Sequence, residues 1–330
     1  MNHLHHTTQD TGHPLISFII ACYNLPADML CQCIDSILCL SLRAFEREII
    51  LIDDGSAHAP LEALADRADH IIYIRQRNQG LSVARNTALR MATGEYVQFI
   101  DGDDYLIQSP YEHCLDIARY TDIDMVLFRM TSTEGSPTSY TDAEERMNGA
   151  AYMRRNNLHG SACSYLFRRA ILGQLRFTPG IYHEDEEFTP LLMLRAEQVL
   201  ATTAQAYFYR LRNNSIITTT TPEVQEKKQN DMKDIIIRLN TLSETLPIVE
   251  RMALQRRVAQ LTMDLIYNVI MQTKSYEKVE TFLEELRAKG LFPLPDHDYT
   301  KKYKLFRIAT NSTIGLRFLV STLPFSSRER

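Results

Sequence analysis

The sequence has no tryptophan and few residues that interrupt secondary structure, with 12 Gly and 12 Pro among 330 residues. This scarcity excludes collagen-like and low-complexity chains. No run reaches the roughly 18–20 consecutive apolar residues that a membrane-spanning helix needs. Hydrophobic residues make up 45% of the chain and charged residues 23%, which is typical of a folded globular protein. The length allows two domains, or one large α/β unit with an appendage.

Cysteine pairs and a strong net charge are also missing. The six cysteines include no CxxC pair and follow no zinc-site spacing, so we interpret them as reduced cytosolic thiols. A net charge of −5 argues against nucleic acid as a partner. The charge is uneven, because residues 300–330 carry +6 and residues 1–299 carry −11. Basic and apolar residues alternate in this tail, which fits either an interfacial helix on an anionic membrane or a terminal helix packed on the protein.

The chain opens with a polar segment, residues 1–13, that contains four histidines. It has neither the basic part nor the apolar part of a secretory signal. We expect a disordered tail here, because nothing around these histidines would fix the geometry of a metal site.

The first hundred residues alternate short β-branched runs with amphipathic stretches. The runs predict strands at 15–22, 48–52, 70–74 and 95–100, and the amphipathic stretches predict helices at 26–42, 60–66 and 81–91. This alternation indicates a mostly parallel sheet with helices on both faces, a fold in which ligands bind beyond the carboxyl ends of the strands. After a helix at 110–120, a strand at 124–130 and a Thr-rich linker at 218–222, the pattern is helical, at 231–246, 249–272 and 276–291.

Glycine-rich phosphate-binding motifs are absent, since the chain contains neither GxGxxG nor GxxxxGK[ST]. Acidic residues instead follow two predicted strands, as Asp53-Asp54-Gly55-Ser56 and Asp101-Gly102-Asp103-Asp104. Carboxylates at one sheet edge bind hard divalent cations, and such a cation can hold a diphosphate. Ordinary acidic turns are the alternative interpretation.

Four ordered segments give these clusters a context: SFIIACYN at 17–24, ILIDDGS at 50–56, RNQGLSVARNTALRMATGEYVQFIDGDD at 77–104 and GIYHEDEEF at 180–188. Together they resemble the inverting nucleotide-sugar glycosyltransferases of family 2. The resemblance implies the A-type glycosyltransferase fold, an α/β Rossmann-like mixed and mostly parallel sheet flanked by helices. It divides the chain into a nucleotide-sugar-binding half (14–104), an acceptor-binding half (105–221) and a helical C-terminal region (222–330) with the basic amphipathic tail.

The resemblance implies a nucleoside site at the ends of the first two strands. Ala21 and Tyr23 match positions that contact the nucleoside in the family. Asp53 and Asp54 match the place where a carboxylate accepts a hydrogen bond from the base. Because the N3–H of uracil is a donor that a charged acceptor binds strongly, we expect a UDP-linked donor.

The same resemblance implies a diphosphate and metal site at the fourth strand. Arg85 and Asn86 match donor-site residues of the family, with a solvated surface arginine as the alternative. Asp101 and Asp103 match the metal-binding DxD motif, with Asp103 as the direct ligand. The expected cofactor is a divalent cation, Mn²⁺ or Mg²⁺.

The acidic run His183–Glu187 lacks the second histidine of an HExxH metalloprotease motif. On its own it would be a solvated first helical turn. The resemblance makes Asp185 the catalytic base and leaves the two acids after it solvated. Inversion needs a base on the face opposite the leaving diphosphate, and Glu184 and the loop around Asp142 are the other places to look for one.

Two further features concern the acceptor side. The segment YFYRLRNNSI at 207–216 is similar to the family's YRxRxxSI, whose cations either meet the diphosphate or are solvated on a strand. Many relatives carry a tryptophan near the position of Cys163, and this chain has none. Tyr165 is the residue we expect to replace it as an aromatic platform for the acceptor.

The sequence therefore predicts an inverting, metal-dependent glycosyltransferase that acts on a hydroxyl of a glycan or lipid-linked glycan, on the cytoplasmic side of a membrane. A sugar-phosphate nucleotidyltransferase is one alternative, although the loop ACYNLPADM after the first strand lacks the glycines of that class. A non-catalytic glycan-binding module is the other, and the intact DxD and ED motifs argue against it.

Overall fold

The computed structural model describes residues 12–135, 139–143, 145–211 and 221–323. Most of the predicted N-terminal tail, most of the Thr-rich linker and the end of the basic tail lie outside these residues. The chain forms two compact units. Unit 1 comprises residues 1–149 and 159–218, and unit 2 comprises residues 150–158 and 219–330.

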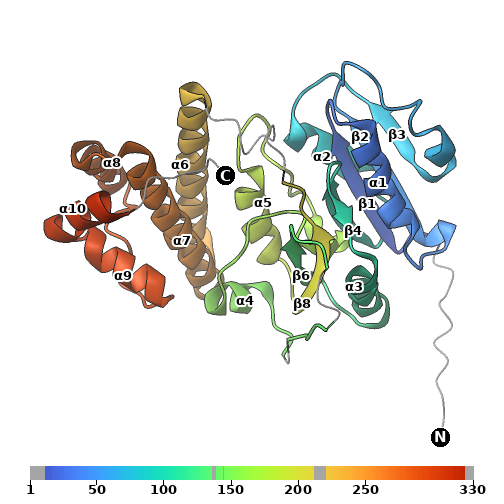
Figure 1. The fold of residues 1–330 in the computed structure, drawn as a ribbon. Helices are drawn as coiled ribbons and strands as arrows, with labels where there is room; N and C mark the ends of the chain where they lie inside the picture. Colours follow the sequence, from blue (N-terminus) through green and yellow to red (C-terminus); the bar gives the residue numbers. More distant parts are fainter. Residues whose placement is uncertain (1–11, 136–138, 144, 212–220, 324–330) are drawn as a thin grey trace, which may run out of the picture. The chain divides into compact units, whose positions relative to one another are not determined.

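Unit 1 is built on one mixed sheet, whose eight strands within the described residues follow the order β3-β2-β1-β4-β7-β6-β8-β5 (Figure 1). β1 pairs in parallel with β2 and β4, and β2 pairs in parallel with β3. β7 runs antiparallel between β4 and β6, while β8 is parallel to β6. The strands are β1 Ile16–Cys22, β2 Arg47–Asp53, β3 Ile72–Arg75, β4 Tyr96–Asp101, β5 Tyr105–Leu106, β6 Met125–Thr131, β7 Tyr165–Arg168 and β8 Val199–Phe208.

The inner strands β1, β2 and β4 are buried along most of their length, which explains their nearly continuous apolar sequence. Four α-helices flank the sheet: α1 Ala27–Leu38, α2 Leu81–Met91, α3 Gln108–Tyr120 and α5 Glu184–Met193. These elements have the mixed, mostly parallel architecture of the A-type glycosyltransferase fold that the sequence predicts.

One predicted helix of this unit, at 60–66, is wrong. The chain there forms turns followed by a short 3-10 helix, η2 Ala65–His70. Leu64 is the only buried residue between positions 60 and 70. A single buried side chain cannot anchor a helix that short, because most helical stability comes from packing a whole apolar face.

Unit 2 is helical. α6 Pro222–Thr245, α7 Ile248–Thr273 and α8 Tyr276–Ala288 match the helices expected from periodicity, although α6 begins earlier than predicted. Arg257 of α7 donates a hydrogen bond to the carbonyl of Leu158 at 2.7 Å, which ties the segment after α4 (Gly149–Arg155) to this unit.

The basic tail forms two helices rather than one, α9 Lys301–Thr310 and α10 Thr313–Thr322. The break follows from Ser312, whose hydroxyl accepts the N–H of Gly315 at 2.9 Å and caps a new helix. Within the described parts of the chain, no helix combines the length and the hydropathy needed to cross a bilayer.

Candidate active site

The parallel pairing of β1, β2 and β4 brings the predicted motifs to one edge of the sheet. In the register of these strands Cys22 lies opposite Asp53, and Ala21 lies opposite both Ile52 and Asp101. The motifs after the three strands are therefore neighbours, as the sequence predicted from the fold class. The edge is the carboxyl end of the strands, where ligands bind in sheets of this kind.

The turn after β1 is locked to the turn after β2. Asn24 has a positive φ of 49°, and its side-chain oxygen accepts the N–H of Ala57 at 2.8 Å. In return the N–H of Asn24 donates to the hydroxyl of Ser56 at 2.9 Å. These bonds leave Tyr23 at the edge with 51% of its surface exposed, where an aromatic ring is accessible to a ligand.

The two acids at the end of β2, Asp53 and Asp54, are buried and accept hydrogen bonds from the protein itself. Asp53 accepts the N–H of Ser56 and the hydroxyl of Tyr73, both at 2.8 Å. Asp54 accepts bonds at 2.7 to 3.0 Å from a side-chain amide and two backbone N–H groups of the loop 76–80, which leads into α2. Asp53 thus holds the turn, as the alternative interpretation of this cluster expected, whereas the bonds from Asp54 to loop 76–80 were not predicted. The contact of either carboxylate with a nucleoside base stays a prediction.

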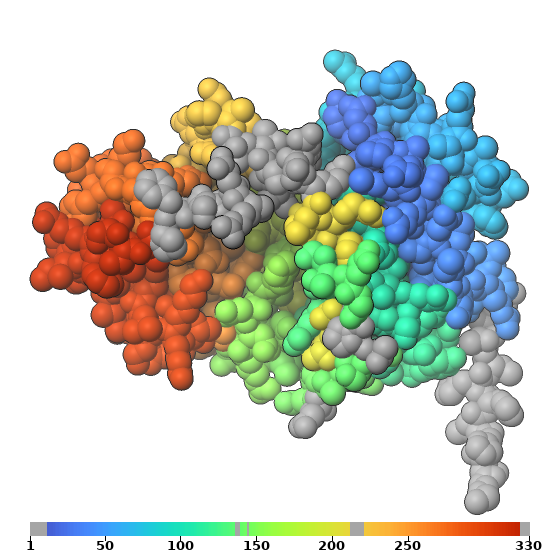
Figure 2. Space-filling model, viewed as in Figure 1, coloured from blue at the N-terminus to red at the C-terminus, as the bar shows by residue number. Residues whose placement is uncertain are grey.

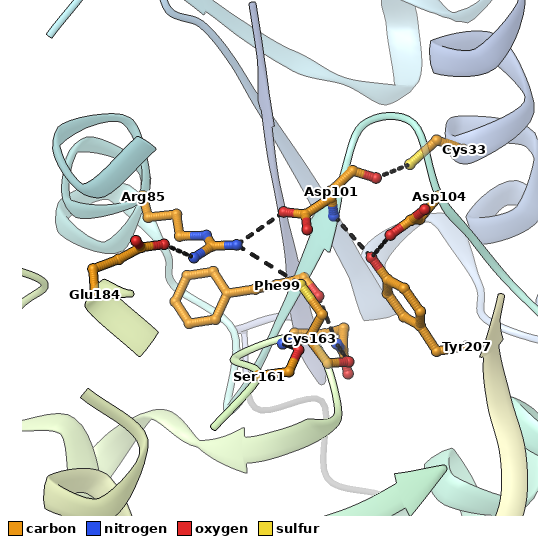
Figure 3. Close-up of polar contacts among 10 residues, drawn as sticks. Cys33, Arg85, Phe99, Asp101, Asp104, Ser161, Cys163, Glu184 and Tyr207 are labelled. Carbon is orange, nitrogen blue, oxygen red and sulfur yellow. Dashed lines mark hydrogen bonds and ion pairs between the residues drawn. The ribbon is translucent and has the colours of Figure 1, made fainter. Parts of the chain in front are cut away.

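Arg85 lies at the centre of the site and joins two motifs that are far apart in the sequence (Figure 3). It projects from α2 and is buried. Its guanidinium donates to Asp101 at 2.8 Å and to Glu184 at 2.9 Å, so one cation connects the DxD motif with the acidic motif of α5. Burial alone would lower the pKa of Arg85, but the neighbouring Asp101 and Glu184 raise it above its ordinary value. The group therefore stays charged.

Two aromatic rings hold this guanidinium in place. It lies 5.7 Å from the ring centroid of Phe99 and 5.3 Å from that of Phe177. The next residue along α2, Asn86, fixes the backbone of Phe177, donating to its carbonyl at 2.8 Å and accepting its N–H at 2.9 Å. The structure therefore gives Asn86 a positioning role, while its predicted contact with the donor stays untested.

The DGDD segment at the end of β4 contains two half-exposed acids, Asp101 and Asp103, and one buried acid, Asp104. The Asp101 side chain is 38% exposed, whereas Asp104 is buried. Asp104 accepts the hydroxyl of Tyr207 and the N–H of Arg210, both at 2.8 Å. Burial and the nearby Asp101 raise the pKa of Asp104 to about 8. The third acid of the run thus anchors the loop.

Gly102 lets this loop pack closely against the first strand and helix. A Cβ atom there would lie 2.8 Å from a methyl group of Leu25 and 3.3 Å from the carbonyl oxygen of Ala21. Glycine at this position therefore permits the close approach of the loop to the end of β1.

Two residues at and just after the end of β8, Tyr207 and Arg210, form hydrogen bonds with the same loop. Arg210 donates to the carbonyl of Asp103 at 2.8 Å and to the side chain of Gln32 at 2.6 Å. Tyr207 accepts the N–H of Asp101 at 3.0 Å. The sequence predicted that the cations of segment 207–216 lie at the diphosphate or in solvent, and it did not predict these hydrogen bonds to the DGDD segment. Residues 212–216 of that segment lie outside the described residues.

The acids at the carboxyl edge of the sheet can be compared with the ligands that a divalent cation needs. Across the described ranges, no three His, Cys, Asp or Glu side chains gather in a way that could hold a metal on their own. Asp101 and Asp103 supply two carboxylates, with one residue between them, at the carboxyl edge of the sheet. Mg²⁺ and similar hard cations often bind through one or two carboxylates, with substrate phosphates completing the shell. The pair therefore fits a cation that binds together with a diphosphate.

The acidic motif begins α5. His183 adopts the left-handed conformation, with φ of 64°, immediately before the helix. Burial and the adjacent Glu184 and Glu186 raise the pKa of Asp185 well above its ordinary value. Burial also raises the pKa of Glu184, against the opposing effect of Arg85. A carboxylate with a raised pKa is better matched to accepting a proton near neutral pH.

The expectation that Glu186 and Glu187 are solvated is wrong for Glu187. It is buried and accepts the hydroxyl of Thr178 at 2.6 Å. Glu186 is half-buried and sits so close to Gly160 that a Cβ there would lie 2.0 Å from its carboxylate. The first turn of α5 faces the protein because Phe188, which follows, stacks on Phe177.

Tyr165 is wrong as an acceptor platform. It is 1% exposed, and its hydroxyl lies 3.0 Å from that of Thr189. As a strand residue of β7 pointing into the core, it cannot offer its ring to a sugar. Asp142, the other place considered for a base, is paired with His113 at 2.7 Å.

An α/β sheet with a DxD motif at its carboxyl edge, linked through a buried arginine to a second acidic motif, is the arrangement of a nucleotide-sugar transferase fold of the A type. The chain belongs to glycosyl transferase family 2, and the family model matches residues 17–176. The match includes the first three motifs and ends before the acidic start of α5.

The similar proteins include bacterial glycosyltransferases. The uncharacterized glycosyltransferase YibD of Escherichia coli strain K12 is 29% identical over 61% of this chain and 62% of its own length. Glycosyltransferase GlyA of Streptococcus pneumoniae is 27% identical over 75% of this chain and 38% of its own. The chain thus spans less than two thirds of either relative. A cholesterol galactosyltransferase of Borreliella burgdorferi is 24% identical over 97% of this chain and 95% of its own.

Two solved structures share the fold. TarS 1–349 of S. aureus in complex with UDP-GlcNAc has a TM-score of 0.55 at 18% identity and covers 90% of this chain and 91% of its own. The mannosyltransferase PcManGT of Pyrobaculum calidifontis, in complex with GDP-Man and Mn²⁺, has a TM-score of 0.52 at 15% identity and covers 94% and 86%. At these identities the likeness supports the fold alone.

Proposed function

We propose that the chain is an inverting glycosyltransferase that moves a sugar from a nucleoside diphosphate, UDP in the first place, to a hydroxyl of a glycan or glycolipid. The observation that carries the proposal is Arg85, which binds Asp101 and Glu184 at once and so brings the donor-side and acceptor-side acids into one site. Family membership and the order of the four motifs support the same reaction class.

The donor binds at the carboxyl edge of β1, β2 and β4. Ala21 and the exposed Tyr23 face the nucleoside, and Asp53 and Asp54 shape the turn on which the base rests. UDP is the first choice because the N3–H of uracil is a donor that a carboxylate at this edge would bind strongly. Of the two solved structures that share the fold, TarS binds UDP-GlcNAc and PcManGT binds GDP-Man.

Asp103 and Asp101 are the residues that would hold a Mn²⁺ or Mg²⁺ ion at the diphosphate. When bound, the cation supplies positive charge that stabilises the departing diphosphate. Arg85 orients the carboxylate of Asp101, and Arg210 fixes the backbone of Asp103. These contacts keep both acids in one geometry before the donor arrives, which lowers the cost of binding it.

Asp185 acts as the general base. The acceptor oxygen forms a bond to the anomeric carbon while the bond from that carbon to the diphosphate oxygen breaks. The hydroxyl proton passes to Asp185, and the nucleoside diphosphate leaves with the bonding electrons. The raised pKa of Asp185 supports this role, because the carboxylate then has an affinity for the proton that it receives.

We also propose a cytoplasmic location and an acceptor that is attached to, or is itself, a lipid. All six cysteines are free, which fits a reducing cytoplasm. One relative of nearly equal length is a cholesterol galactosyltransferase, so an acceptor hydroxyl on a lipid is consistent with the family, and we place the enzyme at the inner face of a membrane.

A thermal-shift panel of UDP-, GDP-, dTDP- and CMP-sugars, with and without Mn²⁺, tests the proposal, since a ligand that binds only the native state stabilises it. We expect one UDP-sugar with Mn²⁺ to raise Tm most and to be consumed with release of UDP. Stabilisation by a sugar phosphate and UTP with release of pyrophosphate would instead identify a nucleotidyltransferase. Stabilisation by glycans alone, without any nucleotide effect, would identify a glycan-binding module.

A further inference from the structure

The hairpin of α9 and α10 in unit 2 has two contrasting faces. Its inner face is buried and contains Tyr303, Phe306, Leu316 and Val320. Its outer face exposes four large apolar side chains, namely Leu305 (68%), Ile308 (53%), Ile314 (84%) and Phe318 (64%). Helical spacing places Leu305 and Ile308 on one side of α9, and Ile314 and Phe318 on one side of α10. Both helices lie at the surface of the unit (red in Figure 2).

The same segment is basic and has no acidic residue. Between positions 300 and 323 the chain contains five Lys or Arg residues and no Asp or Glu. Lys304 pairs with Asp298 at 2.8 Å, and Arg307 pairs with Asp296. Among the described residues, no carboxylate pairs with Lys301, Lys302 or Arg317. Exposed apolar side chains and unneutralised cations therefore occur on one small hairpin.

We propose that the outer face of this hairpin binds the surface of an anionic lipid bilayer. The four apolar side chains enter the boundary between head groups and acyl chains, and the lysines meet lipid phosphates, as in other interfacial amphipathic helices. Lys301 lies one turn before Leu305, and Arg317 lies one turn after Ile314, so a cation and an apolar group share a side on each helix. The inference deepens the proposed function, on which its meaning rests, because it brings the enzyme to a lipid-linked acceptor.

Charge favours the bilayer over a second copy of the chain. A symmetric dimer through this face would set the cations of one hairpin against the same cations of the other. Like charges in contact are repulsive, and no acid between positions 300 and 323 is available to offset them. An anionic leaflet removes that repulsion and takes up the apolar side chains as well.

Flotation of the full chain with vesicles of phosphatidylcholine, with and without phosphatidylglycerol, tests the proposal. We expect binding to the anionic vesicles that high salt weakens, because screening acts on exposed charges. The double variant Leu305→Gln/Ile308→Gln should reduce the partition coefficient about tenfold or more, since burying a large apolar side chain contributes about 1.5–3 kcal/mol. The double variant Lys301→Gln/Lys302→Gln should lose about fivefold per lysine, the equivalent of about 1 kcal/mol each.

A matched control replaces two exposed apolar residues of α7, Ile248→Gln/Met252→Gln, which are 65% and 43% exposed. We expect this variant to float like the parent protein. Equal binding to neutral and anionic vesicles, or an equal loss in the α7 control, would overturn the proposal. So would a dimer in sedimentation velocity that dissociates in the Leu305 variant while the parent protein fails to float.

The lysine variant also guards against a folding defect, since both lysines are exposed and the only ring contact it removes is that of the Lys302 ammonium, 5.5 Å from the centroid of Tyr267. UDP affinity, measured on every variant, separates this inference from the proposed function. Lost flotation with unchanged UDP affinity supports the hairpin. Unchanged flotation in both hairpin variants refutes it and leaves the proposed function standing.

Discussion

The DGDD loop after β4 and the acidic start of α5 have similar compositions but different environments. After β4, Asp101 is accessible at the sheet edge and paired with Arg85, while Asp104 is bound inside the protein. At α5 the acids lie close together, and burial, with the nearby charges of Glu184 and Glu186, raises the pKa of Asp185. Accessible carboxylates suit a cation and its diphosphate, whereas a carboxylate with raised proton affinity suits a base. The environment of an acid, more than its place in a motif, thus indicates its chemistry.

The largest expected effect is on the α5 side. Asp185→Asn should lose about 10²–10⁴-fold in kcat, the usual contribution of a general base, with the affinity for UDP nearly unchanged. Steady-state transfer to a competent acceptor measures it. Asp142→Asn is the matched control, because Asp142 pairs with His113 outside the Arg85 network. A loss in Asp142→Asn with normal turnover in Asp185→Asn would move the base to Asp142.

The next effect concerns the cation. Asp103→Asn should remove the enhancement of UDP binding by Mn²⁺, with a loss of about tenfold or more in affinity in the presence of the metal. Calorimetry with UDP, with and without Mn²⁺, measures it. Asp116→Asn on α3 changes a 59% exposed side chain and should leave the enhancement intact. Undiminished enhancement in Asp103→Asn would contradict the assignment.

A third prediction separates buried acids from ligand-binding acids. Asp54→Ala should destabilise the fold by about 1–3 kcal/mol, because it leaves the N–H groups of loop 76–80 without an acceptor. Denaturant unfolding of this variant beside Asp103→Asn measures the difference. If Asp54→Ala unfolds like the parent protein and loses only UDP binding, the carboxylate of Asp54 serves to bind the nucleotide and does not stabilise the fold.

The smallest effect is a pH dependence. Asp185 must be ionised to accept a proton, and its raised pKa moves the protonated form to higher pH than for an ordinary aspartate. We therefore expect kcat to fall as pH decreases toward that pKa, with the midpoint above the ordinary carboxylate range. A pH profile of kcat measures it, and the residual activity of Asp185→Asn should lack this acid limb. An acid limb at the ordinary pKa of aspartate would contradict the raised value.

The sequence predicted the parts of the fold that depend on local pattern. β1, β2, β4 and α2 follow from continuous apolar runs and helical periodicity, and the resemblance to the family supplied the order of the motifs. The helix expected at 60–66 failed because propensity alone does not hold a segment with one buried side chain. Likewise, Ser312 marked a helix start that the amphipathic pattern of the tail concealed.

The sequence predicted which residue types form the candidate site, but it did not predict which of these residues contact one another. Arg85 and Glu184 are 99 residues apart, and nothing in either motif indicates that they pair. The burial of Glu187 was equally hidden, because acids in a first helical turn are usually solvated and its partner Thr178 lies outside the turn. The hydrogen bonds from Tyr207 and Arg210 to Asp104 have one signal in the sequence. DGDD contains a third acid, and a DxD motif requires only two.

The most direct test of the division between the two acidic regions measures UDP affinity, with and without Mn²⁺, and turnover in Asp103→Asn and Asp185→Asn side by side. We predict that Asp103→Asn loses the cation-dependent part of UDP binding, and that Asp185→Asn binds UDP with Mn²⁺ like the parent protein while its turnover falls about 10²–10⁴-fold. Loss of cation-dependent binding in Asp185→Asn, or turnover near the parent value in that variant, would contradict the account.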